Sequence, residues 1–168
     1  MKAEITQLPN FTTNGVLKTS GGNGTLTVDT SVSSIQETTV TVSSAELLAL
    51  FTTPKTLISS PGAGSYISVI SFDMYYTYVS AAYANTGNNL NVKYDNASGY
   101  TLTPNLFAGG FLDQTNDVVY QSPFLGSVYQ QASTNILNKP LVLTYANSNL
   151  TTGGGNLKIF ITYKIITP

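Results

Sequence analysis

The segment near the end of the chain constrains the fold most, because its apolar residues recur at every second position. Between Leu157 and Ile166 the polar residues Lys158, Thr162 and Lys164 alternate with an apolar set: Leu157, Ile159, Ile161, Tyr163 and Ile165. A period of two is that of a β-strand with one buried face. The segment therefore predicts a strand in a sheet that covers a core.

A longer segment, Tyr66 to Val79, repeats this period and is the longest strand candidate. Its even face is predicted to be buried and its odd face exposed; the even face carries Tyr66, Ile70, Phe72, Met74, Tyr76 and Tyr78, and the odd face Ser71, Asp73 and Thr77. Shorter candidates lie between turns rich in Gly, Asn and Pro: Thr39–Val42, Lys55–Ser59, Leu90–Tyr94, Val118–Tyr120 and Leu141–Tyr145. This pattern predicts an all-β fold, an antiparallel sandwich or jelly roll of about eight strands.

One short helix interrupts the predicted strands. Ser43 and Glu46 have the spacing of a capping box, in which each residue satisfies a free backbone group of the other. The apolar run Leu47–Phe51 follows as one or two helical turns. The helix is predicted to end before Pro54, because a residue that precedes proline avoids the α conformation.

The first 38 residues differ from the rest and are predicted to form an extended stalk of strands and turns, followed by the main domain at 39–168. They are poor in large apolar residues and contain a near-repeat in which Asn14-Gly15 and Asn23-Gly24 each precede a short run with strand propensity. Asn-Gly pairs favour tight hairpin turns. A flexible glycine-rich leader is the alternative. As a stalk the segment would need neighbouring chains, with interface candidates at Asn14, Leu17, Asn23, Leu26 and Val28.

The residue types that are missing argue against an enzyme. The chain has no His, Cys, Trp or Arg, which removes the usual general base, the thiolate nucleophile and the bidentate anion clamp. No catalytic residue, cofactor or metal is therefore expected. The loop Asp113–Asp117 is a weak calcium candidate without the spacing of a known calcium loop, and Asp95-Asn96 is weaker still. Gly153–Gly155 is interpreted as a turn, since no Lys-Ser/Thr and no helix follow it.

The charge of the chain is low and balanced. Its net charge is −1 and charged residues make up 9% of it, so it lacks the basic patch that nucleic acid or an anionic membrane surface would require. No apolar run has the length of a membrane span. A surface with so few charges favours coverage by partners, which is a first indication of an assembly.

Tyrosines offer the remaining candidates for recognition. Tyr75 and Tyr83 are predicted to lie at an interface or in solvent, where they could contact partner proteins or sugar rings. Tyr76 and Tyr78 are expected in the core, because they fall on the apolar face of their strand.

Two parts of the chain resemble proteins of tailed-phage particles. The run from Asn14 to Thr30, with its Asn-Gly, Lys-Thr and Val-Asp-Thr units, resembles repeated segments of phage fibres. The rest is similar to small phage virion proteins that carry Ala45–Pro54, then Pro61–Gly64, and end with Pro140–Leu143 and Gly153–Lys158 before a final tyrosine-bearing strand. Head fibres of crAss-like gut phages are the nearest comparison.

This resemblance implies a β-rich virion protein, a trimeric head fibre or capsid decoration protein. Its N-terminal segment would attach to the particle and its β domain would project from the capsid surface. The expected partners are two further copies of the chain and other virion proteins, and neither nucleic acid nor membrane. The alternative is a module of a tail fibre or collar that binds a receptor or a host-surface glycan. A glycosidase-like enzyme is a third hypothesis, for which the scattered carboxylates provide no recognisable pair.

Overall fold

The structure is a computed structural model that describes residues 16–20, 25–29, 35–102, 106–122 and 132–168. The chain divides into two compact units, residues 1–34 and residues 35–168. The second unit begins earlier than the composition indicates, because its first strand, β3, spans Gln36–Val42. Glu37 and Thr39 on this strand are exposed. The polar start of the strand therefore looks like the preceding segment in composition.

The first unit contains an antiparallel pair of strands, β1 (Val16–Ser20) and β2 (Thr25–Asp29). The register places Leu17 opposite Val28 and Thr19 opposite Leu26. The segment 21–24 connects the two strands. Two predicted interface residues, Asn14 and Asn23, lie outside the described residues.

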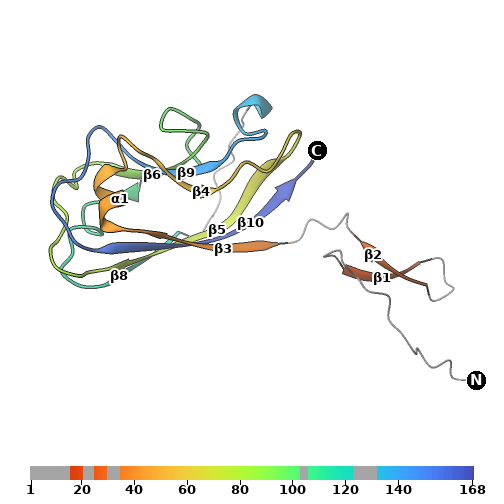
Figure 1. The fold of residues 1–168 in the computed structure, drawn as a ribbon, viewed down its shortest axis with the longest axis horizontal. Coiled ribbons are helices and arrows are strands. Elements are labelled where there is room, and N and C mark those ends of the chain that lie inside the picture. The colour runs from red at the N-terminus through yellow and green to blue at the C-terminus, as the bar shows by residue number, and fades with distance from the viewer. Residues whose placement is uncertain (1–15, 21–24, 30–34, 103–105, 123–131) are drawn as a thin grey trace, which may run out of the picture. The chain divides into compact units, whose positions relative to one another are not determined.

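The second unit is a sandwich of two antiparallel sheets (Figure 1). The first sheet has the order β3-β10-β5-β8, with β10 at Asn156–Ile166, β5 at Tyr66–Thr77 and β8 at Val118–Ser122. The second has the order β4-β9-β6-β7, with β4 at Lys55–Ile58, β9 at Leu141–Tyr145, β6 at Asn89–Tyr94 and β7 at Leu106–Phe107. The prediction of an antiparallel β-sandwich is confirmed.

The strand pairing of this unit is that of a jelly roll. The first strand pairs with the last (β3 with β10), the second with the second-last (β4 with β9), and so inward through β5 with β8 to β6 with β7. A long hairpin rolled into two facing sheets produces this order. The architecture is therefore the jelly roll that the sequence predicts, with the strand order now defined.

The core lies between the two sheets and follows the predicted alternation closely in β10. Leu157, Ile159 and Ile161 are buried there, while Tyr163 and Ile165 on the same face are partly buried. The facing sheet contributes the inward residues of β9 and β6: Leu141, Leu143, Tyr145, Leu90, Val92 and Tyr94. Burial of these side chains is the main favourable contribution to folding.

The alternation predicted for β5 is correct in its second half and wrong in its first. Phe72, Met74 and Tyr76 are buried, but Ile67 is buried in place of Tyr66, and Ile70 is 41% exposed. The register against β10 shifts between Thr162 and Tyr163, because Ser71 pairs with Thr162 and Val69 pairs with Tyr163. Ile70 is thus the extra residue of a β-bulge, and the bulge reverses which residues face the core.

Within the described residues a single α-helix is present, α1 (Ser44–Ala49), together with one 3₁₀ turn, η1 (Ser133–Asn135). The predicted capping box is confirmed. The Glu46 amide donates to Ser43 Oγ at 3.4 Å, and the Ser43 amide donates to Glu46 Oε2 at 2.8 Å. Leu47 and Leu50 pack into the core beneath the helix. The helix is therefore held by its cap and by burial of its apolar side.

Candidate functional site

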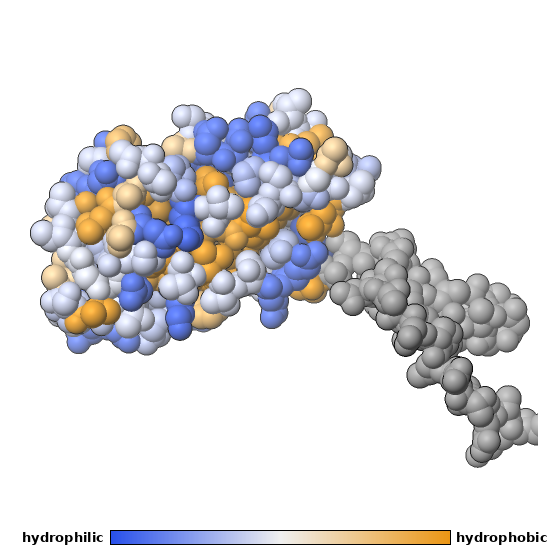
Figure 2. Space-filling view, in the orientation of Figure 1, coloured by the Kyte–Doolittle hydropathy of each residue, from blue (hydrophilic) through white to orange (hydrophobic). Residues whose placement is uncertain are grey.

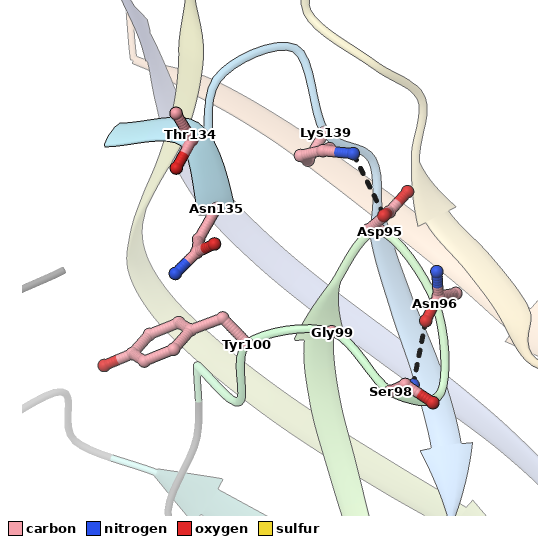
Figure 3. Close-up of a pocket in the computed structure, with 8 residues that line it drawn as sticks. All are labelled: Asp95, Asn96, Ser98, Gly99, Tyr100, Thr134, Asn135 and Lys139. Carbon is pink, nitrogen blue, oxygen red and sulfur yellow. Dashed lines mark hydrogen bonds and ion pairs between the residues drawn. The ribbon is translucent and has the colours of Figure 1, made fainter. Parts of the chain in front are cut away.

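A polar pocket of about 440 Å³ lies at one end of the sandwich (Figure 3). The loop after β6 forms one wall, and η1 with the segment that leads from it to β9 forms the other. The lining residues are Asp95, Asn96, Ser98, Gly99, Tyr100, Thr134, Asn135 and Lys139. The two walls are more than thirty positions apart in the sequence, and they meet because β6 and β9 are paired neighbours.

Hydrogen bonds of the backbone shape the first wall. Asp95 has a φ of 74°, a left-handed conformation, and starts a tight turn in which Asn96 Oδ1 accepts from the Ser98 amide at 2.8 Å. The Tyr94 amide then donates to the Tyr100 carbonyl at 2.8 Å and closes the loop. A Cβ at Gly99 would overlap the Tyr94 carbonyl oxygen, so only glycine fits there.

The two walls are tied to each other. The Asp95 amide donates to the Pro140 carbonyl at 2.9 Å, and Lys139 Nζ donates to Asp95 Oδ2 at 3.0 Å. The second wall is also anchored to the neighbouring turn, since the Asn138 amide donates to the Ser65 carbonyl at 2.8 Å. The pocket is thus formed by the fold itself before anything binds.

Some side chains in the pocket are engaged and others are available. Asp95 and Lys139 pair with each other, whereas the exposed side chains of Thr134 and Asn135 make no hydrogen bond within the described part of the chain. Tyr100 is partly buried and adds an aromatic ring to the lining. The pocket therefore offers amide and hydroxyl groups beside an aromatic surface.

Among the described residues that line the pocket, Asp95 is the only carboxylate, whereas general acid and base catalysis on a sugar requires two. Over the ranges that the structure describes, no group of three His, Cys, Asp or Glu side chains converges as a metal site would require.

The loop Asp113–Asp117 uses its carboxylates to hold local structure. Asp113 Oδ1 accepts from the Gly110 amide at 2.7 Å. Asp117 accepts from the Tyr75 hydroxyl at 2.8 Å and from the Tyr78 amide at 2.9 Å. The two acids therefore accept hydrogen bonds from different parts of the chain.

The two tyrosines predicted at an interface have different positions. Tyr75 points outward from β5, where it pairs in register with Lys158 and Val119, and its hydrogen bond to Asp117 raises the pKa of its hydroxyl. The prediction for Tyr83 is wrong: its side chain is only 2% exposed and belongs to the core. Burial raises the pKa of Tyr83, as expected for a hydroxyl removed from water.

Tyr83 is buried because the Gly153–Gly155 turn makes room for it. A Cβ at Gly153 would overlap the Tyr83 ring, and a Cβ at Gly155 would overlap the Tyr76 ring. The Tyr83 hydroxyl donates to the Gly155 carbonyl at 2.7 Å. The interpretation of these glycines as a turn is confirmed, and the structure adds that aromatic rings lie directly against the turn's backbone.

Sequence reasoning did not identify Tyr100, Thr134, Asn135 or Lys139 as site residues. Each is unremarkable locally, and only the pairing of β6 with β9 brings the two walls together. The N-terminal candidates Leu17, Leu26 and Val28 lie on β1 and β2, and their interface role remains a prediction.

The chain matches no protein-family model, and no curated protein matches it. In the parts of the chain that the structure describes, no helix combines the length and the apolar character needed to cross a bilayer.

Proposed function

We propose that the protein is a structural component of a tailed-phage particle, a homotrimeric head fibre or capsid decoration protein. It attaches to the capsid through its N-terminal segment and carries the β-sandwich on the capsid surface. The observation that carries this proposal is the jelly-roll pairing of β3 with β10 through β6 with β7. Jelly rolls form viral capsid and lectin domains, so the fold suits a role in assembly and recognition.

The small first unit supports assembly. β1 and β2 form a two-stranded sheet of five-residue strands. An isolated ribbon of this size is marginally stable in water. Neighbouring chains would supply the missing contacts, and a shared stalk of three copies is the arrangement that we propose.

The surface of the sandwich gives a second line of support. On the outer side of the first sheet, Phe160 is 43% exposed and Val119 is 58% exposed, with Ile70 at the bulge also exposed. A groove of about 410 Å³, lined in part by Leu57, Ile58, Tyr163 and Ile165, opens between β3 and β4. Figure 2 shows a band of hydrophobic side chains across the visible face of this unit. Such surfaces favour association.

Labelling of purified particles tests the proposal. Particles from a culture that expresses the gene are banded by density and imaged with antibodies to the chain. The chain should sediment with the DNA-containing particles, and the label should lie on the capsid surface. A chain that stays in the soluble fraction and labels no particle would contradict a structural role.

A further inference from the structure

We propose that the pocket between the β6 loop and the η1–β9 segment is a binding site for a neutral saccharide. The site is independent of the structural role proposed above and would stand even if the chain were not a virion protein. A capsid-surface protein with such a site would add weak attachment to glycans.

The polar groups of the pocket suit sugar hydroxyls. The Asn135 side chain provides a donor and an acceptor, and the Thr134 hydroxyl provides both on one atom. The Asp95 carboxylate of the other wall lies 3.0 Å from the Lys139 ammonium, which is on the same wall as Asn135 (Figure 3). Two adjacent sugar hydroxyls can donate to such a carboxylate and accept from such an ammonium. Paired groups, and groups that make no hydrogen bond among the described residues, therefore surround one hollow.

The aromatic ring distinguishes a sugar from other polar ligands. Tyr100 lines the pocket across from Asn135, so a ligand between the walls would meet an aromatic side chain and an amide together (Figure 3). A pyranose has an apolar C–H face and a rim of hydroxyls, which matches an aromatic surface flanked by polar groups. Inorganic anions lack the apolar face.

The charge balance of the pocket favours a neutral ligand. Among the described residues that line it, Asp95 and Lys139 are the only charged ones, and their charges offset each other. A phosphate or carboxylate would meet the Asp95 charge, and a cation would meet Lys139. A neutral hydroxylated ligand encounters neither repulsion, and its hydroxyls can bind to both groups.

The pocket is shaped for binding before a ligand arrives, which lowers the entropic cost of association. The left-handed turn at Asp95 and the glycine requirement at position 99 fix the first wall. Its volume falls in the range of about 300–1,000 Å³ that is usual for small-molecule sites. Because the lining residues are partly open to solvent, we expect millimolar affinity and no turnover.

NMR titration of the full chain tests the site. The probes are the methyl glycosides of glucose, galactose, mannose and N-acetylglucosamine, with lactose and chitobiose. At least one probe should shift the amide signals of Gly99, Tyr100 and Asn135 in a saturable way. Asn135→Ala should weaken that binding about tenfold, the factor expected for loss of one hydrogen-bonding group. Asp95→Asn, which keeps a residue tolerated in the left-handed turn, should also weaken it.

A matched control lies at the opposite end of the sandwich. Asn116 is exposed in the loop that precedes β8, so Asn116→Ala should leave the binding unchanged. The proposal is overturned if no probe shifts these amides, if Asn135→Ala and Asp95→Asn both bind as tightly as the unaltered chain, or if the shifts cluster elsewhere. Tighter binding of inorganic phosphate than of any probe would overturn the neutral character of the site.

Discussion

The two ends of the sandwich are closed by different kinds of contact. At the closed end, defined by Tyr76, Tyr83 and the Gly153–Gly155 turn, aromatic rings lie directly against backbone. At the open end, defined by the pocket of Figure 3, hydrogen bonds tie two loops together around a hollow, and the side chains of Thr134 and Asn135 make no hydrogen bond among the described residues.

The comparison shows that the closely packed aromatic residues and the polar pocket lie at opposite ends of the strands. β5 runs between the two ends, because Ile67 near its start accepts a hydrogen bond from Tyr94 beside the pocket, while Tyr76 near its finish contacts Tyr83. A tightly filled end contributes stability. The other end contributes less to stability, so a hollow lined with polar groups can be tolerated there.

Gly153→Ala should break the closed end and have the largest effect. Gly153 has a φ of 116°, and a Cβ there would overlap the buried Tyr83 ring. Strain and overpacking together should lower the free energy of unfolding by about 3 kcal/mol. Gly87→Ala is the matched control, because Gly87 is exposed and a Cβ there meets nothing within 4 Å. Chemical denaturation should separate the two variants, and equal stabilities would contradict the packing described here.

Tyr83→Phe and Tyr76→Phe should sharpen the account of the closed end. The Tyr83 hydroxyl donates to the Gly155 carbonyl in a buried setting, so its removal should cost about 1–2 kcal/mol. The Tyr76 hydroxyl is buried and has no hydrogen-bond partner in the described structure. Its removal should be neutral or slightly stabilising. Thermal unfolding of the two variants measures the difference, and the reverse order of stability would exclude this assignment.

Glu46→Gln tests the cap of helix α1 at the same end. We expect it to change how the free energy of unfolding depends on pH. The pKa of Glu46 is lowered from 4.5 to about 2. The largest cause is the hydrogen bond from Lys55, and hydrogen bonds from the Ser43 backbone and side chain add to it. Because the folded pKa is depressed, the stabilisation is present above pH 4.5 and is lost as the pH falls toward 2. Glu46 is partly exposed, so solvent screening limits the effect to about 1 kcal/mol.

The measurement is the free energy of unfolding between pH 7 and pH 2.5. The unaltered chain should lose more stability over this range than the Glu46→Gln variant does. Parallel curves for the two proteins would show that Glu46 contributes nothing through its charge.

Asn135→Ala should have the smallest effect on stability, within about 0.5 kcal/mol of zero. The Asn135 side chain is exposed and makes no hydrogen bond among the described residues, so its loss removes no packing. Thermal unfolding provides the check. A loss of stability comparable to that of Tyr83→Phe would show that both ends serve packing and would remove the contrast between them.

The sequence predicts the parts of this fold that depend on local pattern. The alternation in β10 identifies its buried face, and the spacing of Ser43 and Glu46 identifies the helix start. The same reasoning misplaces Ile70, because a β-bulge changes the phase of a strand without any local signal in residue type. It also misplaces Tyr83, since burial there depends on a distant glycine turn.

The candidate site could not be predicted for a related reason. The sequence presents Asp95-Asn96 only as a weak metal candidate, and no motif marks Asn135. Their proximity follows from strand order, which is set by long-range pairing of β6 with β9. A site made by topology becomes visible only when the strand order is known.

The central claim is that this chain functions as an assembled structural protein, and its mass in solution tests this most directly. Light scattering of the full chain should give three times the 17.9 kDa of a single copy. The same measurement on a chain that lacks residues 1–34 should give a smaller species, because the shared stalk would be gone. A full chain that scatters as a 17.9 kDa monomer at all concentrations would contradict the claim.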